Sequence, residues 1–78
     1  MLNIFTKKLK EVRKKKGYTQ ENLATLLDIG IPTYSRKENN LIPFTLEELG
    51  RIKEFLKLSD QDFVNIFFRD IVALKTTK

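Results

Sequence analysis

Three short stretches of the chain share one pattern that predicts where helices begin. Each has an apolar residue, then Ser or Thr, then a polar or acidic residue three positions later, followed by another apolar residue. The stretches are Tyr18-Thr19-Gln20-Glu21-Asn22-Leu23, Phe44-Thr45-Leu46-Glu47-Glu48-Leu49 and Leu58-Ser59-Asp60-Gln61-Asp62-Phe63. The hydroxyl accepts a hydrogen bond from an otherwise unpaired amide, and the two apolar residues pack across the first turn. The sequence therefore predicts helix starts at Thr19, Thr45 and Ser59.

Apolar residues at three- and four-residue spacing predict how far the helices extend. The first helix ends at Gly17, and its stripe is Ile4, Phe5, Leu9 and Val12. The second ends near Asp28-Ile29-Gly30 and carries Leu23, Ala24, Leu26 and Leu27. The later two stripes are Leu46, Leu49, Ile52, Phe55 and Leu56, and then Phe63, Val64, Ile66, Phe67, Phe68, Ile71, Val72 and Leu74. No strand pattern appears, so we expect an all-α fold: a compact bundle of five short helices in a single domain over residues 1–78.

The decapeptide IPTYSRKENN, residues 31–40, is either a polar loop or a short helix with a largely exposed face. Pro32 does not exclude a helix. The N–H groups of the first turn have no partner within the helix, so the N–H that proline lacks is not needed there. In a helix that starts at residue 31 or 32, Tyr34 points inward with the stem of Lys37 or Glu38 beside it. The side chains that then lie towards the other side are Ile31, Pro32, Ser35, Arg36 and Asn39.

Positive charge is concentrated in the first half of the chain. Residues 1–40 hold nine Lys/Arg against four Asp/Glu, whereas residues 41–78 hold six of each. The net charge of +5 therefore belongs to the first half, which suggests a polyanion partner there and a packing or assembly role for the rest. A solubilising surface is the alternative, and for Lys14-Lys15-Lys16 a solvated helix end is favoured over a phosphate clamp.

The composition excludes several classes of site. The chain has no cysteine and no histidine, so disulfides are absent and the usual zinc ligands are missing. The acids Glu47, Glu48, Asp60 and Asp62 are explained as first-turn helix charges rather than as a catalytic pair. We therefore expect no enzyme, no catalytic residues, no metal, no cofactor and no small-molecule ligand. Without a long apolar run or a signal-peptide pattern, we also expect no membrane association and a cytoplasmic location.

The order of these features resembles a known family. The stretch LKEVRKKKGYTQENLATLLDIGIPTYSRKENN, followed by PFTLEELGRIKEFLKLSDQDF, is similar to the Cro/repressor-type helix-turn-helix family, the XRE class, over residues 9 to about 63. The motifs that carry the resemblance are Arg13 with Gly17, Thr19-Gln20-Glu21-x-Leu23-Ala24, Ser35-Arg36, Glu38-Asn39 and Leu46-Glu47-x-Leu49. It implies a lambda-repressor-like bundle whose second and third helices form a helix-turn-helix. The PFTLEE and IFF segments resemble a phage or prophage branch.

The resemblance also implies roles for individual residues. Base contacts would come from Ile31, Pro32, Thr33 and Arg36, and backbone contacts from Gln20, Ser35, Lys37, Asn39 and Asn40. Three positions depart from the family pattern. Gly30 replaces a capping hydroxyl, Lys37 stands at a usually apolar position, with its stem buried and its amine expected to reach a phosphate, and Asn40 replaces a glycine.

The implied function is that of a sequence-specific transcriptional regulator, a Cro-like or repressor-like phage or prophage switch protein that binds a double-stranded DNA operator. One module contacts a short half-site, so we expect a homodimer, formed in solution or on DNA. The last helix and tail, residues 58–78, are the candidate dimerisation element. The alternative is a protein-interaction module, such as an antitoxin or anti-repressor, that binds a protein partner through its apolar last helix.

Overall fold

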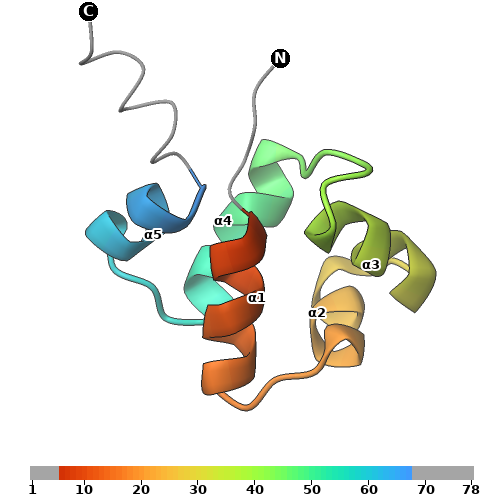
Figure 1. Ribbon diagram of the computed structural model, residues 1–78, viewed down its shortest axis with the longest axis horizontal. Coiled ribbons are helices and arrows are strands. Elements are labelled where there is room, and N and C mark those ends of the chain that lie inside the picture. The colour runs from red at the N-terminus through yellow and green to blue at the C-terminus, as the bar shows by residue number, and fades with distance from the viewer. Residues whose placement is uncertain (1–5, 68–78) are drawn as a thin grey trace, which may run out of the picture.

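A computed structural model describes residues 6–67 of the protein, which form five α-helices and no strand (Figure 1). The helices are α1 (Thr6–Lys15), α2 (Gln20–Leu27), α3 (Ile31–Glu38), α4 (Leu46–Phe55) and α5 (Asp60–Phe67). The predicted all-α bundle of five short helices is therefore confirmed for the described residues. Six of the apolar residues expected in the first and last stripes lie outside them: Ile4, Phe5, Phe68, Ile71, Val72 and Leu74.

All three predicted helix starts are confirmed by hydrogen bonds. Thr19 Oγ1 accepts from the Asn22 N–H at 3.1 Å, and Asn22 Oδ1 accepts from the Thr19 N–H at 2.8 Å. Thr45 and Glu48 form the same reciprocal pair, at 3.1 and 2.9 Å. At the start of α5, Ser59 Oγ accepts from the Asp62 N–H at 3.0 Å. Each hydroxyl therefore satisfies an amide that has no partner within its helix.

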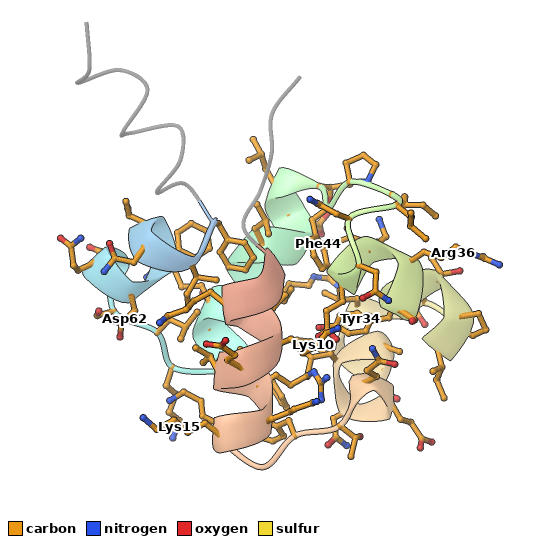
Figure 2. All side chains as sticks on the ribbon, viewed as in Figure 1. Lys10, Lys15, Tyr34, Arg36, Phe44 and Asp62 are labelled. Carbon is orange, nitrogen blue, oxygen red and sulfur yellow. The ribbon has the colours of Figure 1, made fainter. Side chains whose placement is uncertain are left out.

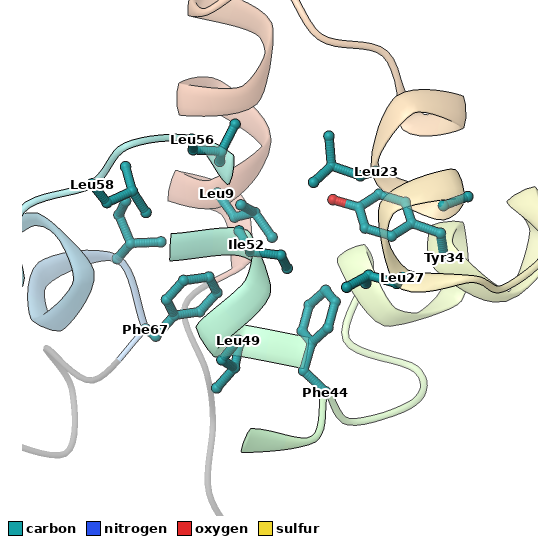
Figure 3. Packing of buried hydrophobic residues seen from close by; sticks show 12 residues of the cluster. Leu9, Leu23, Leu27, Tyr34, Phe44, Leu49, Ile52, Leu56, Leu58 and Phe67 are labelled. Carbon is teal, nitrogen blue, oxygen red and sulfur yellow. The ribbon is translucent and has the colours of Figure 1, made fainter. Parts of the chain in front are cut away.

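One core lies between the helices and draws on all five of them (Figure 3). Leu9, Leu23, Tyr34, Ile52 and Phe67 are fully buried. Phe44, the apolar residue before the Thr45 cap, joins this core, since its ring lies 6.1 Å from that of Tyr34 and 6.4 Å from that of Phe67. The apolar pairs that bracket the helix starts thus connect local capping to tertiary packing.

One residue of the predicted α4 stripe is not in the core. Leu46 is 80% exposed, whereas Leu49, Ile52 and Leu56 are buried and Phe55 is half-buried. Leu46 is the first residue of α4 and, at 100° per residue, lies at the edge of the stripe farthest from Phe55. Helical spacing alone was therefore an incorrect guide at this position.

The helices are arranged so that α1 separates two sides of the molecule. Figure 1 shows α2 and α3 on one side of α1 and α5 on the other, with α4 behind. The packing agrees, because α1 contacts both α3 and α5, whereas α2 contacts α3 and α4. None of the helices within residues 6–67 has the length and apolar character needed to cross a membrane.

Candidate nucleic-acid interface

The connection between α2 and α3 is a tight turn of three residues. Asp28 ends α2 in the left-handed conformation, with φ 59° and ψ 43°. The Ile29 N–H then donates back to the Ala24 carbonyl at 3.0 Å, and α3 begins two residues later, at Ile31. Two short helices joined by such a turn form a helix-turn-helix. The prediction that residues 31–40 form a helix rather than a loop is confirmed for Ile31–Glu38.

The two faces of α3 differ in the way the sequence predicts. Tyr34, Lys37 and Glu38 are buried, and the ring of Tyr34 points into the core (Figures 2 and 3). On the other face Ile31 is 44% exposed, and Pro32, Arg36 and Asn39 are also exposed. The Arg36 side chain points away from the rest of the molecule (Figure 2). A helix with so small a buried face leaves most of its surface free for a ligand.

The N-terminus of α3 is open to anions. Gly30 is the N-cap and supplies no side-chain hydrogen bond, while Pro32 occupies the first turn. The first bond of the helix runs from the Tyr34 N–H to the Gly30 carbonyl at 2.9 Å. Within the described chain, the N–H groups of Ile31 and Thr33 have no acceptor and no acidic residue lies in the first turn. Free amides and the positive end of the helix dipole together favour a phosphate at this place.

A buried carboxylate holds α3 against α1 and α2. Glu38 Oε2 accepts from Arg13 Nε at 2.8 Å and from the Tyr34 hydroxyl at 2.8 Å. Its Oε1 accepts from Arg13 Nη2 at 3.1 Å and from Gln20 Nε2 at 2.9 Å. Arg13 also donates from Nη1 to the Tyr18 carbonyl at 2.8 Å. The bidentate pair joins α1 to α3, the Gln20 bond adds α2, and together these contacts set the orientation of α3.

Hydrogen bonding determines the ionisation of this cluster. Burial alone raises the pKa of Glu38, but hydrogen bonds from Arg13, Gln20 and Tyr34 outweigh burial, and the pKa lies below its ordinary value. Burial and the contact with Glu38 raise the pKa of Tyr34. Glu38 is therefore an anion and Tyr34 a neutral donor at neutral pH.

Gln20 lies where α2 meets α3 and is half-buried. Its amide nitrogen carries two hydrogens, and Glu38 takes one of them. The second N–H is available to another acceptor, so the placement is compatible with a contact from Gln20 to the DNA backbone. That contact stays a prediction.

Lys37 differs from what the resemblance implied. Its stem is buried as expected, but its Nζ donates to Glu48 Oε1 and to the Pro43 carbonyl, both at 3.0 Å. Glu48 caps α4, so this ion pair links α3 to the start of α4 and compensates the buried charge. The ammonium group thus points inward, and Lys37 is a structural cation rather than part of the exposed face.

The remaining predicted contact residues lie on or next to the exposed face. Thr33 and Ser35 are half-buried, and Asn39 and Asn40 are exposed at the end of α3. Asn40 has φ 67°, the left-handed conformation expected where the family pattern has glycine. The structure therefore brings Ile31, Pro32, Thr33, Ser35, Arg36, Asn39 and Asn40 together on one side, with Gln20 at the adjoining helix start.

Lys10 was not identified from the sequence as part of this side. Its Nζ donates to Asn39 Oδ1 at 3.1 Å, and Asn39 Nδ2 donates to Ser35 Oγ at 3.3 Å. A cation of α1 thus stands beside the polar face of α3. The positive first half indicated a cation of this kind, but not which lysine.

The pairing of Arg13 with Glu38 also went unrecognised, although spacing offered a partial signal. Arg13 follows the buried Leu9 by four residues, and Glu38 follows the buried Tyr34 by four. Charged residues at such inward positions need a buried partner of opposite charge. Among residues 6–67, no group of three or more potential metal ligands was found.

Comparison with known families agrees with this geometry. Residues 9–63 match the family model described as helix-turn-helix. The match includes most of α1, all of α2, α3 and α4, and the first turn of α5. It covers the stretch that carried the sequence resemblance, which is thereby confirmed. No curated protein and no solved structure gives a significant match.

Proposed function

The chain belongs to the XRE-type helix-turn-helix family of DNA-binding regulators, and from this premise we propose that it is a Cro-like or repressor-like switch protein of a phage or prophage. In this role it binds a double-stranded DNA operator in the cytoplasm and recognises the operator sequence with α3. The observation that carries the proposal is the division of α3 into a buried face and an exposed polar face with an uncapped N-terminus.

Base recognition in this proposal is assigned to the first turns of α3. Arg36 is exposed and forms no ion pair with any residue in 6–67, so its guanidinium is free to contact a guanine edge. Ile31 offers an apolar contact to a thymine methyl group, while Pro32 and Thr33 supply shape next to it. Because two of these side chains carry no hydrogen-bonding group, sequence-dependent DNA shape contributes the remaining selectivity.

Backbone contacts orient the helix on the duplex. We assign them to Gln20, Ser35, Asn39 and Asn40, together with Lys10 beside Asn39. Such contacts fix the register of the protein but carry no sequence information directly. Of these side chains only Lys10 is charged, so the salt dependence of binding comes from Lys10 and the other cations of residues 1–40 rather than from the neutral contacts.

We further infer that two copies bind one operator. A single α3 covers only a few base pairs, and paired modules read two half-sites about one helical turn apart. Two apolar side chains near the start of α4 support a contact between the copies beside α3. Leu41 is 73% exposed and Leu46 is 80% exposed, so both are available to pack against a second copy. Of the candidate element at residues 58–78, residues 58–67 are described, including α5, and residues 68–78 are not. Sedimentation with and without operator DNA measures the pairing.

Footprinting on the DNA that flanks the protein's own gene tests the proposed function. We expect protection of a short, two-fold-related site, with affinity that falls steeply between 50 and 200 mM salt. The variant Arg36→Ala is expected to lose the preference for this site. Arg51→Ala is a matched control, because Arg51 is an exposed arginine of α4 paired with Glu47 at 3.0 Å.

Binding without any protected site, equally weak on every sequence, would contradict the regulator proposal. An Arg36→Ala variant that keeps its site preference would contradict the assignment of Arg36. Circular dichroism of both variants is expected to show a retained fold, because neither arginine is buried.

A further inference from the structure

Lysines within α1, and Lys16 directly after it, lie on two different sides of that helix. Lys10 faces α3 and contacts Asn39. Lys8, Lys15 and Lys16 instead line a groove of ≈ 530 Å³ between α1 and α5. In Figure 2, Lys15 and Asp62 lie on the α5 side of α1, away from Arg36. A duplex that lies on α3 therefore leaves this groove open.

The groove combines charge with an apolar floor. Val12, Leu58 and Ile66 form the apolar part of its lining, and Asp62 and Asn65 of α5 complete it. Three lysines face one carboxylate, so the groove is positively charged. None of the three ammonium groups forms an ion pair or a hydrogen bond with any residue in 6–67. The exposed Glu11, which does not line the groove, likewise forms no ion pair with these residues.

The chemistry of the lining identifies the kind of occupant. A phosphate backbone would use the lysines but not the apolar floor, whereas an acidic segment with apolar side chains would use both. A second copy of this chain fits less well, because the chain has a net charge of +5. The chain's own residues 68–78 fit less well too, since they hold three Lys/Arg and one acid.

We propose that the groove between α1 and α5 binds an acidic amphipathic segment of a partner protein. Carboxylates of the segment pair with Lys8, Lys15 and Lys16, and its apolar side chains pack on Val12, Leu58 and Ile66. This surface is separate from α3, so the protein can hold the partner and DNA at the same time. A partner protein bound in the groove would then influence the function of the DNA-binding face of α3.

The test uses the full chain, labelled with ¹⁵N, and a synthetic 16-residue peptide of Glu, Ala and Leu with Leu at helical spacing. A second peptide has Ser in place of every Leu. We expect the first peptide to shift the amide signals of α1 and α5, chiefly around Val12, Leu58 and Ile66. The Ser peptide is expected to bind at least fivefold more weakly, since it cannot use the apolar floor.

Two double variants of equal charge complete the test. Lys8→Glu/Lys15→Glu changes the groove, whereas Lys14→Glu/Lys57→Glu changes exposed lysines that do not line it. The first is expected to weaken peptide binding at least fivefold relative to the second, while both keep the wild-type melting temperature within a few degrees.

Equal weakening in both variants would overturn the proposal, because it would mean that net charge alone attracts the peptide. Equal binding of the two peptides, or signal shifts centred on α3, would overturn it as well. DNA binding is measured separately on the same variants. The outcome for the groove therefore does not depend on whether an operator is found.

Discussion

At the scale of single residues, Glu38 determines how α3 is held. Its carboxylate is fully buried and accepts four hydrogen bonds, two of them from Arg13. Removing two charges from water is costly, and this geometry compensates that cost only while both partners remain. The cluster therefore stabilises the orientation of α3 only while all its partners are present, and no single bond accounts for the effect.

Replacing Glu38 by Gln tests this dependence. The change leaves the Arg13 guanidinium buried without an anion, so we expect a loss of about 3–5 kcal/mol in the free energy of unfolding. Urea denaturation measures the loss. Glu47→Gln is the control, because its pair with Arg51 is exposed and worth less than about 1 kcal/mol. Similar losses in the two variants would show that the buried charge of Glu38 contributes no more to stability than the exposed charge of Glu47.

The lowered pKa of Glu38 also predicts the direction of the acid response. The folded state holds the carboxyl pKa below its ordinary value of 4.5. Stability from this group is therefore complete above pH 4.5 and is lost as the pH falls through the lower, folded-state pKa. Urea midpoints between pH 2 and 7 should show this loss, and the Glu38→Gln variant should show a smaller one. An equal acid response in both proteins would rule out Glu38 as its source.

Arg36 and Gln20 should separate two kinds of DNA contact. Loss of a guanine contact in Arg36→Ala should reduce discrimination between operator and mutated operator by about 1–3 kcal/mol. Gln20→Ala removes both the proposed phosphate contact and a hydrogen bond to Glu38. It should weaken binding to all sequences alike, because neither contact carries base information. Fluorescence anisotropy on both DNAs measures the two effects. The assignments would be reversed if Gln20→Ala altered discrimination and Arg36→Ala did not.

At the scale of elements, α3 differs from α2 and α4 at its start. Thr19 and Thr45 cap those two helices with side-chain hydrogen bonds, but Gly30 supplies none to α3. The sequence predicted all of these starts, since hydroxyl caps and a first-turn proline are local signals. The same locality explains the error at Leu46, because whether a first-turn side chain is covered depends on distant parts of the chain.

Gly30→Ser is expected to strengthen the start of α3. A Cβ at this position would lie 3.6 Å from Pro32 Cδ, an ordinary contact, and φ is −72°. The new hydroxyl supplies a cap and the unfolded chain loses freedom, so we expect a gain of about 0.5–1 kcal/mol. Thermal unfolding measures the gain.

Gly50→Ala provides the matched comparison for that variant. Gly50 lies within α4 and is exposed, and a Cβ added there would meet no other group within 4 Å. We expect a gain in stability of about 0.5–1 kcal/mol here too. Only Gly30→Ser should also change operator affinity, because its hydroxyl uses amides at the open end of α3. An equal change in affinity for both variants would argue against phosphate binding at that end.

At the scale of the whole molecule, local sequence patterns do not predict contacts between residues that are far apart in the chain. Local patterns identified the helices and the outward face of α3. They did not pair Arg13 with Glu38 or Lys37 with Glu48, because each pair joins different helices and forms only when the bundle packs. The division of the α1 lysines between the α3 side and the α5 groove has the same origin, since it depends on which helices flank α1.

This division predicts that lysines of one helix differ in their effect on DNA binding. Lys10→Ala removes a cation beside α3, so the slope of log K against log salt should fall by roughly 0.9, the value for one phosphate contact. Lys8→Ala removes the same charge on the α5 side and should leave the slope almost unchanged. Anisotropy titrations between 50 and 200 mM salt measure both slopes. If the two variants lowered the slope equally, DNA would be responding to the total charge of α1, and the assignment of Lys10 to the DNA-binding side would fail.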